Sequence, residues 1–189
     1  RSPTVVQALH AKVEELLLDI SLVFVRKQLS NLPKLRVWGE NKKAKGHLPT
    51  FSASPLNYIT QIAEYLFSLP DQLDPSGQDD GGDGGETDHD FMHHWLSRIT
   101  ECIVQEYIQQ ILAVPSLSSS GRLQLAEDMK YLSSVLETLG SPGLESLQEL
   151  LKLIEATDEN FPQACVSVSS LDRNVIDKIS RKRQAGLAS

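Results

Sequence analysis

The sequence predicts an all-α fold, a rod-like bundle of antiparallel amphipathic helices, and three observations support this prediction. Apolar residues recur at alternating steps of three and four over long stretches, which places them on one face of a helix. Proline, glycine or asparagine stands where these repeats end. No stretch shows the alternation that is typical of a strand. With 189 residues, 40% of them hydrophobic and 23% charged, the chain has the composition of one globular unit.

The first predicted helix is long. It is expected to run for roughly 27 residues, about 40 Å at 1.5 Å per residue, and to end at Asn31 and Pro33, before a basic loop. One side of this helix is apolar along its length and is expected to be buried against neighbouring helices. That side consists of Val6, Leu9, Val13, Leu16, Ile20 and Val23, widened by Leu17 and Phe24.

The second helix is expected to begin at Ser54 or Pro55, because serine is a good N-cap and proline fits the first turn, and to end at Pro70. Its expected buried residues are Leu56, Ile59, Ile62, Ala63, Leu66 and Phe67. Residues 74–90 differ in kind, since they are acidic, rich in glycine and free of lysine and arginine. Such a stretch buries too little apolar surface to offset its ordering entropy, so it predicts a disordered loop.

Three more helices are expected between this loop and Thr157. Asp90 is expected to cap the third helix, which ends before Pro115. Apolar residues from 125 to 139 repeat at helical steps and predict a fourth helix that ends at Gly140. Pro142 starts the fifth, and the short connection predicts that the fourth and fifth helices are antiparallel neighbours. Two short helices, over 161–168 and 171–183, complete the prediction.

Composition excludes several functional classes. A net charge of -7 and a pI near 5.2 argue against nucleic acid as a partner, because that partner requires an excess of lysine and arginine. Two cysteines, each within an apolar helical pattern, cannot provide a disulfide framework, and this fits a reducing compartment. The chain begins with Arg1 and shows no secretion leader. We expect residues 1–189 to be a single helical region of a longer chain.

An alternative role for the first helix is association with a membrane surface. The most apolar run, 16–25, contains Asp19 and is much shorter than the ~20 residues that a membrane span needs. A helix that lies on a membrane surface usually has a basic polar side, whereas this one has Glu14, Glu15 and Asp19. The sequence therefore favours protein partners over lipid for this helix.

His89, His93 and His94 are candidate metal ligands, because His89 and His93 are one helical turn apart and can share a metal. The alternative function is thus a metal-binding helical protein. Against it, His89 precedes the expected start of the helix, and no glutamate lies between the pair as in the metalloprotease pattern. The favoured interpretation is a solvated helix start with no metal and no cofactor.

No other pattern indicates catalysis. Cys102 and Cys165 have no histidine nearby in the sequence, no serine lies in a Gly-x-Ser-x-Gly turn, and no glycine-rich phosphate loop follows a strand. The sequence therefore predicts a binding protein and not an enzyme, with no catalytic residues. Trp38 and Phe51 flank the helices and are candidates for partner binding, although each could equally anchor a buried loop.

Residues 47–56 (HLPTFSASPL), continuing through Tyr58, Tyr65 and Pro70, resemble a signature of subunit 7 of the conserved oligomeric Golgi (COG) complex. The resemblance resumes at Trp95 and extends over roughly residues 47–155, as marked by Tyr107, Ile111, Leu112, Pro115, Leu117, Gln124, Leu125, Ala126, Asp128, Tyr131, Leu132, Val135, Leu139 and Gly140. This similarity assigns the chain to the C-terminal region of that family.

The resemblance implies a helical-rod fold like that of other multisubunit tethering complexes. It implies a non-catalytic subunit that captures vesicles in intra-Golgi retrograde transport and so maintains protein glycosylation. The implied partners are the other subunits of the complex, especially five, six and eight, together with vesicle fusion and trafficking proteins. The implied location is the Golgi membrane, with peripheral attachment on its cytosolic face. No catalytic or cofactor-binding residues follow from the resemblance.

Overall fold

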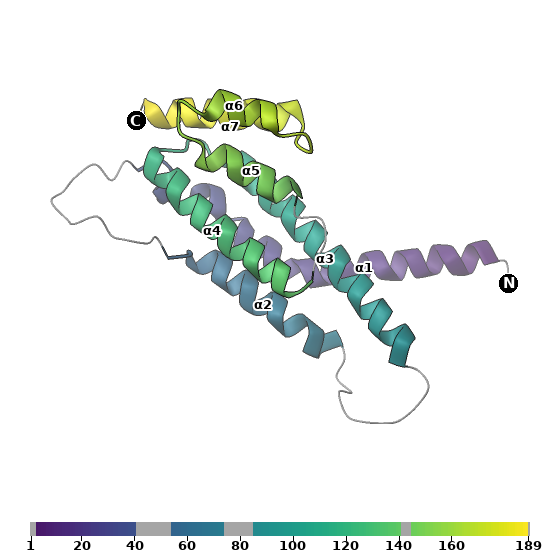
Figure 1. Ribbon diagram of the computed structural model, residues 1–189. Helices are drawn as coiled ribbons and strands as arrows, with labels where there is room; N and C mark the ends of the chain where they lie inside the picture. The colour runs from purple at the N-terminus through teal and green to yellow at the C-terminus, as the bar shows by residue number, and fades with distance from the viewer. Residues whose placement is uncertain (1–2, 41–53, 74–84, 141–144, 189) are drawn as a thin grey trace.

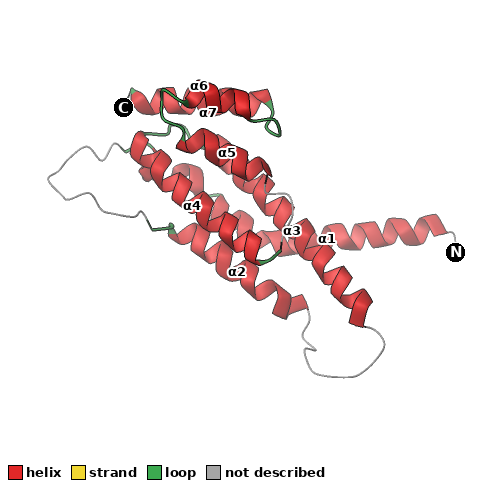
Figure 2. Cartoon of the chain, in the orientation of Figure 1, coloured by secondary structure: helices red, strands yellow, loops and turns green. Residues whose placement is uncertain are grey.

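The computed structural model describes residues 3–40, 54–73, 85–140 and 145–188. This part of the chain consists of helices joined by turns and loops, with no strand (Figure 2). The all-α prediction is confirmed. The elements in chain order are α1 (Pro3–Leu29), the 3-10 turns η1 (Leu32–Lys34) and η2 (Arg36–Trp38), α2 (Asn57–Leu73), α3 (Gly85–Ala113), α4 (Ser119–Thr138), α5 (Glu145–Glu155), α6 (Phe161–Ser167) and α7 (Arg173–Leu187).

The helices form a bundle that α7 crosses at one end (Figure 1). α4 packs against α5, and the two run antiparallel, as the short connection predicts. The C-terminal half of α1 contacts α2 and α3, whereas its N-terminal half projects beyond the other helices (Figure 1). α7 contacts α3, α4 and α5, so it holds one end of the bundle together.

Most predicted helix positions agree with the structure, but both ends of α2 and the start of α3 differ. α2 begins at Asn57 and not at Ser54 or Pro55. The predicted start of the fifth helix at Pro142 lies outside the described residues. α2 continues through Pro70 to Leu73, so the predicted end at Pro70 is wrong. A proline so near the end of a helix removes few hydrogen bonds, and Leu69 beside it is buried in the core. Phe67 was expected to be buried and is 47% exposed. Packing of the surrounding helices thus outweighs the local signal for a stop.

α3 begins at Gly85, five residues before the predicted cap at Asp90. Residues 85–90, which were expected to belong to the acidic loop, are therefore helical, while residues 74–84 lie outside the described residues. The glycines of the stretch, which disfavour a helix, all lie at or before Gly85. The helix starts where the glycines stop.

Buried apolar side chains from α1 to α5 form one continuous core, to which α7 adds Ile179. α3 and α4 supply its centre, with fully buried Ile99, Ile103, Tyr107, Ile111, Leu125, Met129, Leu132 and Leu136. Gly140 has a φ of 67° and ends α4 in the left-handed region, as the sequence predicts.

Candidate protein-binding surface

The side of α1 that the sequence predicts to be buried lies on the surface. We call it the α1 outer face. It extends from Val5 to Phe24, and each of its apolar side chains is between 37% and 65% exposed. Its members are Val5, Val6, Leu9, Val13, Leu16, Leu17, Ile20, Val23 and Phe24. The periodicity correctly places these residues on one side of a helix, but the expectation that neighbouring helices cover them is wrong for the described residues.

The opposite side of α1 makes the contacts with the bundle. Leu22, Val25 and Leu29 are at most 1% exposed and belong to the core. Tyr65 of α2 donates a hydrogen bond from its hydroxyl to the carbonyl oxygen of Ser21 (2.6 Å). At the edge of the outer face, the ring of Phe24 lies 5.1 Å from the ring of Tyr65. α1 therefore carries two apolar sides, one used within this chain and one uncovered.

Ion-paired charged residues border the outer face along one edge. Lys12 pairs with Glu15 at 2.8 Å, and Arg26 pairs with Asp19 at 3.2 Å and with Glu106 of α3 at 3.0 Å. On the other edge Leu17 and Phe24 continue the apolar surface. An apolar area rimmed by polar residues is typical of a protein-binding site, whereas single exposed apolar residues are not.

The candidate metal ligands are not brought together in the part of the chain that can be described. His93 and His94 are exposed on α3, and the side chain of His89 lies outside the described residues. Within the described ranges no three histidine, cysteine, aspartate or glutamate side chains are placed to hold a metal ion. No observation supports the metal-binding alternative.

Trp38 is buried, with 1% of its surface exposed. Its indole N–H donates to the carbonyl oxygen of Leu32 (2.7 Å), and its own carbonyl accepts a bond from the backbone of Ser118 (2.8 Å). Trp38 therefore acts as the buried loop anchor, and it offers no side-chain surface to a partner here. Phe51, the second candidate for partner binding, lies outside the described residues.

The two cysteine thiols lack the environment of a nucleophile. Burial raises the pKa of Cys102 and the pKa of Cys165 above their ordinary values. A thiol with a raised pKa remains protonated at neutral pH and attacks weakly. Cys165 lies in a groove of about 480 Å³ between α6 and α7, next to Phe161 and Ile176.

A buried polar cluster joins α2, α3 and α4. The hydroxyls of Tyr58 and Tyr107 lie 3.0 Å apart, and the Asp128 carboxylate accepts from the backbone N–H of Leu56 (2.9 Å) and from Gln124 (3.1 Å). Burial raises the pKa of Asp128 and the pKa of Tyr107. These bonds join polar groups of three helices inside the core and so help to fix how the helices meet.

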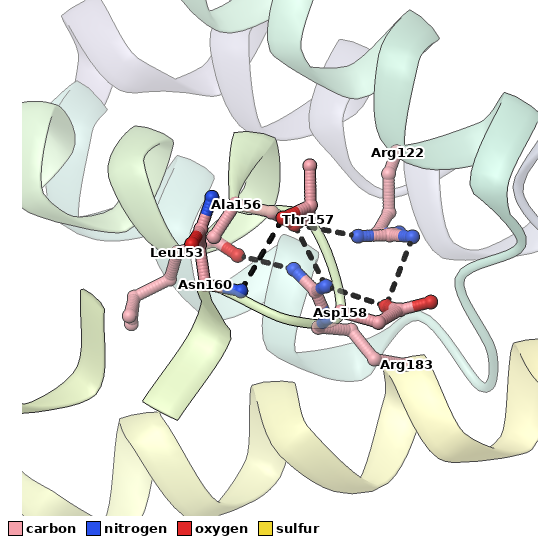
Figure 3. A network of polar contacts seen from close by, with 7 residues as sticks. All are labelled: Arg122, Leu153, Ala156, Thr157, Asp158, Asn160 and Arg183. Carbon is pink, nitrogen blue, oxygen red and sulfur yellow. Dashed lines mark hydrogen bonds and ion pairs between the residues drawn. The ribbon is translucent and has the colours of Figure 1, made fainter. Parts of the chain in front are cut away.

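A second polar network fixes α7 against the end of α5 (Figure 3). The guanidinium of Arg183, which is 4% exposed, donates to the carbonyl oxygens of Leu153 (2.7 Å) and Ala156 (2.8 Å) and to Asp158 (2.8 Å). Arg122 of α4 also donates to Ala156 (2.9 Å). The last carbonyl groups of a helix have no partner within the helix, and these arginines satisfy them.

Glu149 fixes the connection between α6 and α7. Its carboxylate accepts bonds from the backbone N–H groups of Ser169 (2.9 Å), Ser170 (2.8 Å) and Leu171 (3.2 Å) and from both serine hydroxyls. These bonds, with the backbone of Ser169 as the largest cause, lower the pKa of Glu149 to about 2. The arrangement is structural, because the carboxylate is fully used by its own chain.

Sequence reasoning missed both networks and the exposure of the α1 outer face. Arg183 and Glu149 look like ordinary surface charges in the sequence, and only the fold brings their partners to them. The sequence does contain a signal for the exposure of α1, because this helix has apolar residues on two opposite sides. One side has Leu18, Leu22, Val25 and Leu29, and the other has Leu9, Leu16 and Ile20. A helix with two apolar sides requires two sets of neighbours.

Comparison with known proteins finds a family model that covers most of the chain. The family model described as Golgi complex component 7 matches residues 1–184. None of the described helices has the length and apolar content of a membrane span. No solved structure shows a significant match to the chain.

The relatives are similar proteins from plants and animals, named conserved oligomeric Golgi complex subunit 7. The one from Arabidopsis thaliana is 33% identical over 141 residues, which cover 72% of this chain and 17% of the relative. The one from Bos taurus is 30% identical over 177 residues (82% and 23%), and the one from Homo sapiens is 29% identical with the same coverage. The chain thus spans about a fifth of the length of these relatives. On this evidence the chain belongs to the Golgi complex component 7 family.

Proposed function

We propose that this chain is part of a non-catalytic subunit of a Golgi vesicle-tethering complex. Family membership over residues 1–184 and the names of the relatives support a role within a Golgi complex. The finer role that we propose is to hold vesicles during intra-Golgi retrograde transport. Retrograde transport returns glycosylation enzymes to their Golgi compartments. Protein glycosylation depends on this recycling.

The α1 outer face is the observation that carries this proposal. Nine apolar side chains along one helix are exposed, and a contiguous apolar surface of this kind marks a site that binds other protein. A subunit of an assembly needs such a surface, whereas an enzyme needs converging reactive groups.

The partners that we propose are subunits five, six and eight of the same complex, together with vesicle fusion and trafficking proteins. We propose a peripheral position on the cytosolic face of the Golgi membrane. The acidic character of the chain, with a net charge of -7, supports attachment through protein partners, because an anionic membrane surface repels it.

Depletion of the protein in cells, followed by re-expression of the full-length form, tests this function. The expected result is that depletion slows retrograde movement of Golgi enzymes and leaves cell-surface glycans incomplete, as measured by lectin binding, and that re-expression restores both. Normal lectin binding and normal enzyme distribution after complete depletion would contradict the proposal.

A further inference from the structure

One oxygen of a buried carboxylate has no hydrogen-bond partner among the described residues. Asp128 of α4 is fully enclosed, with 0% of its surface exposed. Its Oδ1 atom accepts from the backbone N–H of Leu56 (2.9 Å) and from the side-chain amide of Gln124 (3.1 Å). Its Oδ2 atom is also buried, and no donor in the described part of the chain bonds to it. A buried polar atom without a partner costs free energy, and the cost is larger when the atom carries charge.

No basic side chain in the described ranges pairs with Asp128, since none of their ion pairs includes it. The titratable groups that interact with it are Tyr58 of α2, Tyr107 of α3 and Glu127, its neighbour on α4. Burial raises the pKa of both tyrosines, so they are neutral at physiological pH, and Glu127 adds a negative charge. An ionised Asp128 is therefore both deprived of water and repelled by a like charge.

The surroundings of Asp128 suit a neutral carboxyl group better than a charged one. The hydroxyls of Tyr58 and Tyr107 lie 3.0 Å apart, and the Tyr58 hydroxyl also interacts with the Asp128 carboxylate. A proton on Oδ2 removes the enclosed charge and adds an O–H donor beside this pair of hydroxyls. Oδ1 remains an acceptor, so the bonds from Leu56 and Gln124 are retained.

The electrostatic balance has the same direction. Burial, the largest cause, raises the pKa of Asp128 above its ordinary value of 3.8, although the bonds from Leu56, Tyr58 and Gln124 lower it. As the pH rises from 3.8, the unfolded chain therefore releases this proton first, and the fold loses stability until the folded chain releases it too. Asp128 thus acts in the opposite direction to Glu149, whose pKa is lowered on folding.

The same carboxyl group fixes the start of α2. It binds the N–H of Leu56, directly before α2, and Gln124 donates both to it and to the carbonyl oxygen of Ser54 (2.9 Å). We propose that Asp128 holds a proton on Oδ2 in the folded chain at pH values where exposed aspartates are ionised, and that loss of this proton weakens the contact between α4 and the start of α2. The proposal rests on buried groups of this chain and does not depend on the role in transport.

Hydrogen exchange of the full-length protein, measured by mass spectrometry between pH 4 and pH 8, tests the proposal. Peptides that cover residues 54–66 and 122–136 report on the contact. Wild type is compared at each pH with Asp128→Asn, which has the same shape and no charge, so the intrinsic exchange rate cancels. Above the pKa of the folded state, the variant should exchange more slowly, about tenfold for each unit by which folding raises that pKa. The difference should shrink towards pH 4. Equal exchange at every pH, or slower exchange of wild type at pH 8, would overturn the proposal.

Two further variants assign the effect to Asp128. Tyr58→Phe removes a hydroxyl but no acidic group of this pH range, so it should retain the pH dependence of wild type, and combining it with Asp128→Asn should abolish that dependence. Asp177→Asn, at an exposed aspartate on α7, is the matched control and should leave both peptides unchanged at every pH. Loss of the pH dependence in Tyr58→Phe alone, or an equal effect of Asp177→Asn, would contradict the proposal.

Discussion

Gly121 shows how one residue without a side chain sets the position of a helix. It lies in the first turn of α4, where the helix passes directly over the backbone of Trp38. A Cβ atom at this position would overlap the carbonyl oxygen of Trp38. Ser118 caps the same turn, since its hydroxyl accepts from the N–H of Gly121 at 3.0 Å. The close approach therefore holds the loop after α1 against the start of α4.

Gly121→Ala is expected to destabilise the protein, although the same change in most helices stabilises by about 0.5–1 kcal/mol. The overlap with backbone atoms outweighs that gain, because forced overpacking costs typically 1–3 kcal/mol. Urea denaturation measures the change in the free energy of unfolding. Leu123→Ala, at a 68% exposed site on α4, is the control and should change it by less than about 0.5 kcal/mol. A Gly121→Ala protein as stable as wild type would contradict this packing.

Glu149 predicts a dependence of stability on pH. Its pKa is lowered from 4.5 to about 2 in the folded protein, so its bonds stabilise fully above pH 4.5. As the pH falls from 4.5 towards 2, the unfolded state takes up the proton first, and this stabilisation is lost. Glu149→Gln should therefore lower the melting temperature at pH 7, and its difference from wild type should shrink below pH 4.5. A difference that stays constant from pH 7 to pH 2.5 would count against the role of Glu149.

At the scale of elements, Arg183 decides how α7 is attached. Replacing it with alanine leaves the carbonyl groups of Leu153 and Ala156 at the end of α5 without this donor and removes the contact with the Phe161 ring, whose centre lies 4.2 Å from the guanidinium. Arg183→Ala is expected to lower the free energy of unfolding by roughly 1.5–3 kcal/mol, the range for hydrogen bonds to a charged group.

The control for Arg183 is its exposed neighbour. Arg181→Ala should leave the melting temperature nearly unchanged, because the side chain of Arg181 is exposed on α7. Hydrogen exchange should become faster in α7 and at the end of α5 in the Arg183 variant and remain as in wild type in α2. If the Arg183 and Arg181 variants had the same melting temperature and the same hydrogen exchange, α7 would be held by its apolar contacts alone.

The sequence predicts helices well where local signals and packing agree. Gly140 ends α4 in the left-handed region, and the repeat from Leu125 to Leu136 becomes the buried side of that helix. The prediction fails where packing opposes a local signal. Pro70 looks like a stop, yet α2 continues because Leu69 is held in the core. Local chemistry carries no information about such distant contacts.

At the scale of the whole molecule, periodicity shows which residues share a side of a helix but not what covers that side. Leu9 and Leu16 have the same pattern as Leu22 and Leu29, and only the latter meet α2 and α3. The candidate surface could therefore be located from the sequence as a stripe, while its exposure required the fold. For Trp38 the outcome is the opposite: the sequence makes it a candidate for an exposed binding residue, but the fold buries it in the core.

The central claim is that the chain functions as a component of an assembly, through its surface. Affinity isolation of the tagged full-length protein from cytosol, followed by quantitative mass spectrometry, tests this most directly. The account predicts that the other subunits of the Golgi complex are recovered in constant proportion to the tagged protein. Recovery of the tagged protein without any of them would contradict the account.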